Sequence, residues 1–184
     1  MIFIDQSPLQ NSTLDGWDFR FCNRGMNNAA AVAALQTTLS LAPELAHKGT
    51  IESCLAYRSH PLSTDQVSGL EKEQDEQYFL SIAMKGNQEW FGKLMADHTS
   101  LDWRESIKAN FGGNSQSKTK VLVVASSRSG CFPAAGPMTV VDLVNTKKGG
   151  EVTAKGVVVD WGGHWCYWED PVKFNKLAVD FLEE

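Results

Sequence analysis

Residues 160–171 read Asp160-Trp161-Gly162-Gly163-His164-Trp165-Cys166-Tyr167-Trp168-Glu169-Asp170-Pro171, and this stretch decides how the rest of the sequence is interpreted. It follows the apolar run from Gly156 to Val159 and precedes a helical pattern that reaches the C-terminus. The stretch therefore places His164 on a loop that leaves the carboxyl end of a predicted buried strand. Catalytic side chains in α/β sheets are usually presented at this edge, so His164 is a candidate catalytic residue.

The segments on either side of this loop predict a parallel sheet. Strands are predicted over Lys120 to Ala125 and Val152 to Val159, with a short helix over Met138 to Asn145 between them. This order and spacing are typical of a right-handed parallel crossover. After the loop, Asp170 and Pro171 begin an amphipathic helix whose apolar face comprises Phe174, Leu177, Ala178, Phe181 and Leu182.

A further strand is predicted at the start of the sequence. Met1 to Ile4 is β-branched and aromatic, and the polar cluster with a proline from Asp5 to Pro8 ends it. A wholly apolar strand requires neighbours on both sides, and the sequence before it supplies none. We therefore expect an exposed strand edge that favours self-association.

Most of the residues between the first strand and the second have helical patterns. Helices are predicted over Asn27 to His47, Thr50 to Arg58, Thr64 to Ala83, Glu89 to Asp97 and Asp102 to Asn110. We interpret residues 12–117 as a helical cap insertion within one partial α/β domain that comprises residues 1–184.

Composition and charge restrict the class of partner. The net charge of −5 gives no basic footprint for nucleic acid, and no apolar run approaches the length of a membrane span. The N-terminus lacks the basic and long apolar regions of a secretory signal, so the expected compartment is cytoplasmic. The four cysteines are widely and irregularly spaced, which favours free thiols over a disulfide framework.

The order of elements resembles the last three strands of the α/β-hydrolase fold. The resemblance is carried by Met1 to Pro8, by Asp102-Trp103-Arg104, by Ser129-x-x-Phe132-Pro133-x-x-Gly136, and by Gly163-His164-Trp165 with Glu169-Asp170-Pro171-x-x-Phe174. It is greatest to the cofactor-free haloperoxidase-like and fungal branches of that superfamily. It implies the C-terminal half of the fold, without the half that holds the nucleophile elbow.

The resemblance implies a nucleophile, acid and histidine triad, in which His164 is the general base. The loop after the second predicted strand, Ser126 to Gly130, offers no carboxylate, so Asp5 is the implied acid. The residues alone also allow simpler roles. An aspartate at a strand exit often caps a turn, and a histidine between tryptophans is often only packed.

The nucleophile is not found in this sequence. An elbow needs Gly-x-Ser-x-Gly at a strand-to-helix turn, and the nearest spelling, Gly113 to Ser117, precedes a strand. Cys131 and Cys166 are thiol alternatives, but Cys166 is too close to His164 along an extended loop to point toward it, and a chance cysteine is the simpler interpretation. We therefore expect this chain to be inactive alone.

The implied activity is hydrolysis of an ester or a related acyl compound. Trp165 and Trp17 are candidates for binding a small apolar or aromatic substrate, although tryptophans also bury a cap against a core. The histidines are scattered without ligand spacing, so we expect neither a metal site nor a cofactor. The alternatives are a cofactor-free dioxygenase or haloperoxidase-like enzyme on the same fold, and a non-catalytic binding module.

Overall fold

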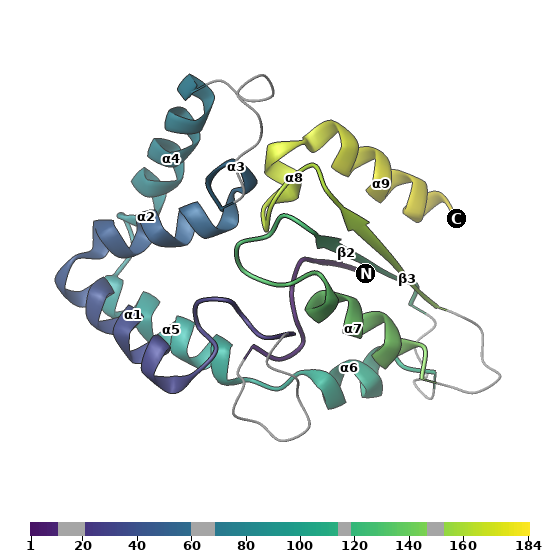
Figure 1. Cartoon of the computed structure of the whole chain (residues 1–184). Helices are drawn as coiled ribbons and strands as arrows, with labels where there is room; N and C mark the ends of the chain where they lie inside the picture. The colour runs from purple at the N-terminus through teal and green to yellow at the C-terminus, as the bar shows by residue number, and fades with distance from the viewer. Residues whose placement is uncertain (11–20, 60–68, 114–118, 147–152) are drawn as a thin grey trace.

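Three parallel strands form the sheet in the computed structural model, which describes residues 1–10, 21–59, 69–113, 119–146 and 153–184. The strands are β1 (Ile2–Ile4), β2 (Val121–Ser126) and β3 (Ala154–Val159), in the spatial order β1-β2-β3. In the register, Ile4 is opposite Val124 and Val124 is opposite Val157. All six residues of β2 are buried because this central strand is covered on both faces (Figure 1).

Each face of the sheet packs against a different set of helices. On one face, Val121 and Val123 contact α7 (Ala135–Val144) and Ile107 of α6 (Arg104–Phe111). On the other face, Leu122 and Val124 contact α9 (Pro171–Glu183) through Phe181. This α/β architecture confirms the predicted fold class and the predicted strand, helix, strand unit.

The C-terminal helix follows the predicted pattern in most respects. The Asp170 side chain accepts a hydrogen bond from the Lys173 backbone N–H at 3.0 Å, so it is the predicted N-cap of α9. Phe174, Leu177 and Phe181 pack on the sheet. The pattern also places Leu182 on this face, but its side chain is 72% exposed, whereas the adjacent Phe181 is buried against the sheet.

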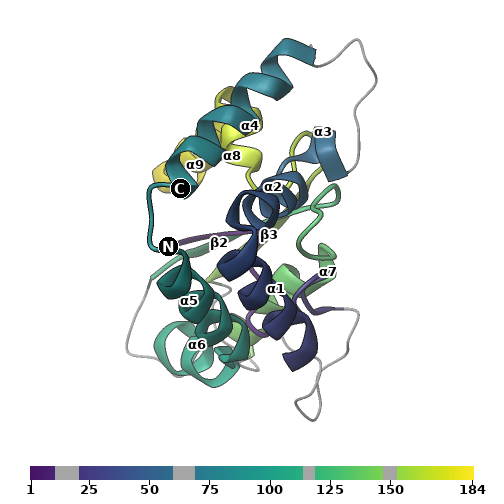
Figure 2. The ribbon, with the colours of Figure 1, turned by 90° about the vertical axis from the view of Figure 1, so that its left-hand side faces the viewer.

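Six helices lie among the described residues between β1 and β2. The structure has α1 (Ala29–Leu41), α2 (Pro43–Cys54), α3 (Ala56–Ser59), α4 (Gly69–Ala83), α5 (Gln88–Ser100) and α6 (Arg104–Phe111). The helices α1 and α5 lie side by side (Figure 2), where Gly92 contacts Gln36 and Leu39. The predicted boundaries of the cap insertion, 12 and 117, lie outside the described residues, so the division into core and cap stays a prediction.

Two predicted helices in this region have other bounds in the structure. The helix predicted over Asn27 to His47 is interrupted at Ala42, between α1 and α2. The sequence pattern predicted a helix start at Thr50, but α2 begins at Pro43 and continues through Gly49 to Cys54. Thr50 donates its side-chain hydroxyl hydrogen to the Ala46 carbonyl, a bond made inside a helix instead of at its start. The chain then breaks at Leu55, before the short helix α3, and this break lies against the loop after β3.

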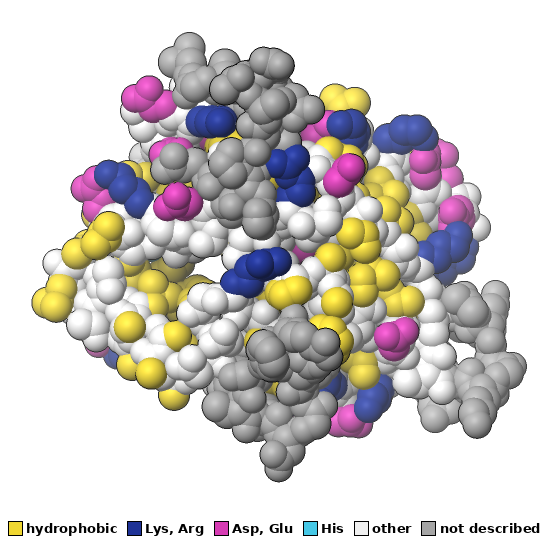
Figure 3. Space-filling model, in the orientation of Figure 1, with side chains coloured by type: hydrophobic (Ala, Val, Ile, Leu, Met, Phe, Trp, Pro, Cys, Tyr) yellow, Lys and Arg dark blue, Asp and Glu magenta, His cyan; other side chains and the backbone are white. Residues whose placement is uncertain are grey.

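The surface carries charges of both signs. On the face shown in Figure 3, the Lys and Arg side chains are interspersed with Asp and Glu side chains. No helix among the described residues has the length and apolar character needed to cross a membrane.

Candidate active site

The carboxyl ends of the three parallel strands meet at one edge of the sheet, as the direction of the strands requires. Asp5 follows β1, the polar loop that begins at Ser127 follows β2, and His164 lies on the loop after β3. The junction between α2 and α3 completes this edge. There the Trp165 backbone N–H donates to the Cys54 carbonyl at 3.0 Å.

Asp5 is fully buried and has a backbone conformation that is uncommon for a residue with a side chain. Its φ is +46°, in the left-handed region, and it has the one positive φ among the described non-glycine residues. Aspartate tolerates this region better than most residues, and such conformations cluster at functional sites. One carboxylate oxygen, Oδ1, accepts the Ser126 backbone N–H at 2.8 Å, and Oδ2 lies 3.0 Å from Nδ1 of His164.

Two glycines allow the loop to bring His164 to Asp5. A Cβ on Gly162 would lie 2.7 Å from the Cα of Cys166, and a Cβ on Gly163 would lie 2.7 Å from the Cys54 carbonyl oxygen. Only glycine permits so close an approach between backbones. The Ser126 hydroxyl also donates a hydrogen bond to the Gly162 carbonyl, which ties the loop to the end of β2.

The Glu169 carboxylate, at the end of the short helix α8 (Cys166–Glu169), holds the histidine loop in place through backbone hydrogen bonds. Glu169 accepts the Gly163 N–H at 2.5 Å with one oxygen and the Ala56 N–H at 2.9 Å with the other. Burial raises the pKa of Glu169, and these hydrogen bonds from the backbone oppose that rise. The histidine loop and the α2–α3 junction are therefore held together by one partly buried carboxylate, which we call the Glu169 clamp.

The pairing with Asp5 sets the charge and the tautomer of His164. Burial opposes the charged imidazolium, but the hydrogen bond to Asp5 and the negative charges of Cys131 and Asp5 outweigh it, so the pKa of His164 is raised. A carboxylate only accepts hydrogen bonds, so Nδ1 carries the proton that faces Asp5. In the neutral ring, Nε2 is then left with a free lone pair, as a general base requires.

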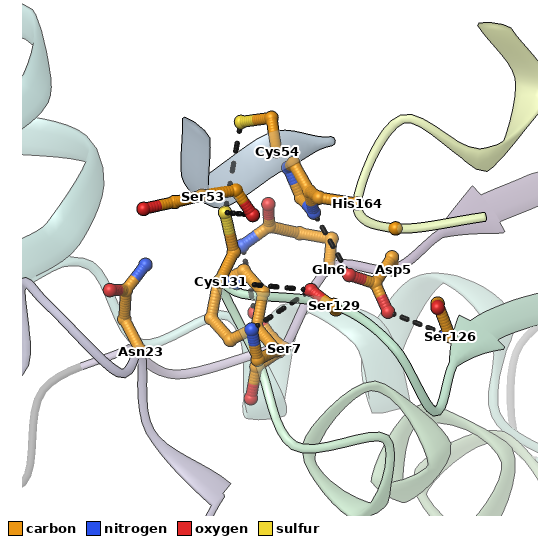
Figure 4. A network of polar contacts seen from close by, with 12 residues as sticks. Asp5, Gln6, Ser7, Asn23, Ser53, Cys54, Ser126, Ser129, Cys131 and His164 are labelled. Carbon is orange, nitrogen blue, oxygen red and sulfur yellow. Dashed lines mark hydrogen bonds and ion pairs between the residues drawn. The ribbon is translucent and has the colours of Figure 1, made fainter. Parts of the chain in front are cut away.

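Two cysteines lie beside the imidazole ring (Figure 4). The sulfur atoms of Cys54 and Cys131 are 3.7 Å apart, and one nitrogen of His164 and both sulfurs lie within 4.8 Å of one another. The hydrogen bond from Cys54 lowers the pKa of Cys131 against the opposing effect of burial, and the charge of His164 lowers it further. The same bond, with burial, raises the pKa of Cys54, so Cys54 is the thiol that keeps its proton.

The loop that carries Cys131 is held by a buried serine. The Ser129 hydroxyl oxygen accepts the backbone N–H groups of Cys131 and Phe132, each at 3.1 Å. A cavity of about 300 Å³ reaches this loop, and Ser53, Gly130 and Cys131 are among its lining residues. A larger apolar cavity of about 640 Å³ lies beside β1 and α6, but neither Asp5 nor His164 lines it.

The structure thus brings together two of the predicted site residues, Asp5 and His164. Trp165 packs against Phe79 with ring centroids 4.4 Å apart, and its role in substrate binding stays a prediction. Trp17 lies outside the described residues, as does most of the elbow-like spelling from Gly113 to Ser117. The buried Cys166 packs with the apolar cluster under the sheet, which agrees with the rejection of this thiol as a nucleophile.

The sequence did not predict that Cys54 lies close to Cys131 and His164. Cys131 was visible as a residue of the loop after a parallel strand, which is a position that favours function. The pattern of the helix predicted over Thr50 to Arg58 places Cys54 on its inward face, but no local pattern indicates which loop that face contacts.

The comparisons with known proteins were informative for structure only. No protein-family profile and no curated protein matches the sequence. Among solved structures, the bromoperoxidase from Bacillus anthracis matches with a TM-score of 0.70 and 12% identity, over 96% of this chain and 55% of that one. The esterase EaEST from Exiguobacterium antarcticum matches with a TM-score of 0.70 and 14% identity, over 96% of this chain and 54% of that one.

A third match is MGS-M2, an α/β-hydrolase enzyme from a Medee basin deep-sea metagenome library, with a TM-score of 0.58 and 16% identity, over 83% of this chain and 50% of that one. The chain has the α/β-hydrolase fold. It spans about half the length of these matched structures, which agrees with the predicted C-terminal part of the fold. At such low identities the α/β-hydrolase likeness is a likeness of fold alone.

Proposed function

We propose that this chain supplies the acid and the base of an α/β-hydrolase triad that hydrolyses an ester or a related acyl compound. The observation that carries the proposal is the Asp5 carboxylate, which accepts the Ser126 N–H with one oxygen and faces Nδ1 of His164 at 3.0 Å with the other. Such a carboxylate fixes the tautomer of the imidazole and stabilises the imidazolium that forms during the reaction.

The nucleophile in this proposal comes from chain outside these 184 residues. Among the described residues, β1 pairs only with β2, so its other edge is open to a further parallel strand. The carboxyl end of such a strand would lie at the same edge of the sheet as Asp5. A serine on the turn after that strand would then face Nε2 of His164, as a nucleophile elbow requires.

The chemistry follows from these positions. Nε2 takes the proton of the nucleophile hydroxyl as the oxygen attacks the ester carbonyl, and the imidazolium then gives that proton to the departing alkoxide. Water next attacks the acyl group, with Nε2 again as base, and releases the acid and the free nucleophile. We further propose a small apolar or aromatic substrate, in line with the tryptophans of the loop that carries His164.

The test compares the 184-residue chain with a longer form that includes an upstream Gly-x-Ser-x-Gly segment. We expect hydrolysis of p-nitrophenyl esters by the longer form only. In that form, His164→Ala and Asp5→Asn each lower kcat/KM, by about 10⁴-fold if they act as triad members. Equal rates for the short and long forms, or full activity of the longer His164→Ala variant, would contradict the proposal.

A second candidate is a cofactor-free oxygenase or haloperoxidase, because one of the matched structures is a bromoperoxidase. Here the Asp5–His164 pair would deprotonate an organic substrate that then reacts with an oxidant. Consumption of oxygen or halide by the longer form, without ester hydrolysis, would favour this candidate. Substrate-analogue binding that His164→Ala leaves unchanged, with no turnover by any form, would instead favour a binding module.

A further inference from the structure

Three potential ligands of a metal ion converge at the carboxyl edge of the sheet, although they are far apart in the sequence. We propose that Cys54, Cys131 and His164 form a binding site for Zn²⁺ or a similar thiolate-binding ion. No sequence pattern indicates such a site, because the residues come from α2, the loop after β2 and the loop after β3. Among the described residues, this is the one group of three with metal-binding atoms so close together.

The separation of the two sulfur atoms fits zinc without rearrangement. Two sulfurs bound to tetrahedral zinc at about 2.3 Å each lie about 3.8 Å from one another. Those of Cys54 and Cys131 are already 3.7 Å apart, whereas a disulfide would need them to move to about 2.0 Å. One ring nitrogen of His164 lies within 4.8 Å of both sulfurs, which makes His164 the third ligand of the proposed site.

The surroundings of His164 are those of a metal-binding imidazole. Zinc-binding histidines usually donate their other ring N–H to a carboxylate, which fixes the tautomer and strengthens the ligand. The Asp5 carboxylate lies 3.0 Å from Nδ1, which leaves Nε2 for the metal.

The backbone around each ligand is held in place. Ser129 bonds the N–H of Cys131, the Cys54 carbonyl accepts the N–H of Trp165, and Glu169 clamps Gly163. The site is therefore organised before any ion binds. The cavity that reaches Cys131 and Ser53 gives a route of entry, and it leaves room for water as a fourth ligand.

Zinc binds cysteine as the thiolate, so its binding would displace the thiol protons of Cys54 and Cys131.

Occupancy would have a consequence for catalysis, and this part rests on the proposed function. A metal on Nε2 would take the lone pair with which His164 accepts the proton of a nucleophile. Zinc would then inhibit the hydrolase, and a chelator or a small thiol that competes for the zinc would restore its activity.

The test uses the 184-residue chain, reduced and freed of metal, and titrates it with Co²⁺ and then Zn²⁺. We expect one equivalent of Co²⁺ to give a thiolate-to-cobalt charge-transfer band and the intense visible bands of tetrahedral cobalt. Zn²⁺ should displace the cobalt and abolish the bands. This readout needs no turnover, so its failure is separate from a failure of the proposed function.

Variants assign the ligands. Cys54→Ser with Cys131→Ser should abolish the charge-transfer band, and Asp5→Asn should weaken Zn²⁺ binding by about 10- to 100-fold through the orientation of His164. Cys22→Ala, a buried cysteine outside the cluster, is the matched control and should keep the spectrum. Circular dichroism identifies any variant that fails to fold. Absence of the bands in the folded wild-type chain, or their persistence in the double serine variant, would overturn the site and leave only a thiol-to-thiol hydrogen bond.

Discussion

The Glu169 clamp offers the sharpest test of how the histidine loop is held. Its two carboxylate oxygens accept the N–H groups of Gly163 and Ala56, which lie in different segments and are both buried. Glu169→Ala leaves both donors without this acceptor. Each buried donor that loses its partner costs about 1–3 kcal/mol, so the two together cost about 2–6 kcal/mol.

Part of that loss is offset, because the wild-type protein also buries a carboxylate whose pKa burial has raised. We therefore expect Glu169→Ala to lower the free energy of unfolding by about 3 kcal/mol. In urea, with an m value of about 2 kcal/mol/M, the midpoint would fall by about 1.5 M. Glu169→Gln keeps an oxygen for one N–H and carries no charge, so its loss should be smaller.

The control for this experiment is Glu105→Ala, which removes a glutamate whose side chain is 84% exposed and ion-paired to Lys108. Such a surface change should stay within about 0.5 kcal/mol of wild type. If Glu169→Ala unfolds at the same urea concentration as Glu105→Ala, the carboxylate does not hold the loop and the reasoning is wrong.

Three further predictions concern the same edge of the sheet. The raised pKa of His164 means that the native state binds its proton more tightly than the unfolded chain, so this contribution to stability is complete below about pH 6.5 and is lost as the pH rises through the folded-state pKa. Urea unfolding across that range should show the decline, and His164→Gln should lack it. Gly163→Ala places a Cβ 2.7 Å from the Cys54 carbonyl oxygen and should lower the free energy of unfolding by about 1–3 kcal/mol, as measured by thermal melts. Gly49→Ala, in the middle of α2 where none of the described residues outside α2 lies within 4 Å of the added Cβ, should raise it by up to about 1 kcal/mol in the same measurement. Finally, the Met1 carbonyl and the Asp5 N–H form hydrogen bonds with β2, so by alternation the Ile2 N–H points to the outer edge of β1. If that edge drives self-association, Ile2→Pro should reduce the apparent mass measured by sedimentation at high protein concentration. A wild-type chain that is monomeric under these conditions would refute the idea.

The strands and the Asp5–His164 pair could be predicted because their signals are local. An apolar run that ends in a polar residue marks a strand exit, and parallel strands bring their exits to one edge whatever the helices between them do. The predicted N-cap Asp170 is confirmed, and of the two candidate caps Asn27 and Asn28 the structure uses Asn28, since a cap is decided within four residues.

The features that could not be predicted depend on how distant segments pack. Cys54 reaches the site because α2 ends there and the break at Leu55 contacts Gly163 on the loop after β3. Helical periodicity over Thr64 to Ala83 predicts that Tyr78 and Ile82 are buried, but they are 49% and 47% exposed, and the Tyr78 ring stacks on Trp168 with centroids 5.3 Å apart. Periodicity gives the apolar face of a helix but not the amount of surface that covers it.

The simpler interpretation of Asp5, as the cap of the turn that follows it, does not describe its contacts. The donor to Oδ1 is the Ser126 N–H at the end of β2, and not an N–H of that turn. Oδ2 faces the imidazole ring of His164, which is 159 positions away in the sequence. The Asp5 backbone, from which this carboxylate projects, has a left-handed conformation. Asp5→Asn would keep an oxygen for Ser126 while it removes the negative charge beside Nδ1. If Asp5 only caps the turn, this variant should keep both the pH dependence of stability and the cobalt spectrum. If Asp5 orients His164, Asp5→Asn should lose the pH dependence of stability and weaken the cobalt spectrum, while the variant still folds.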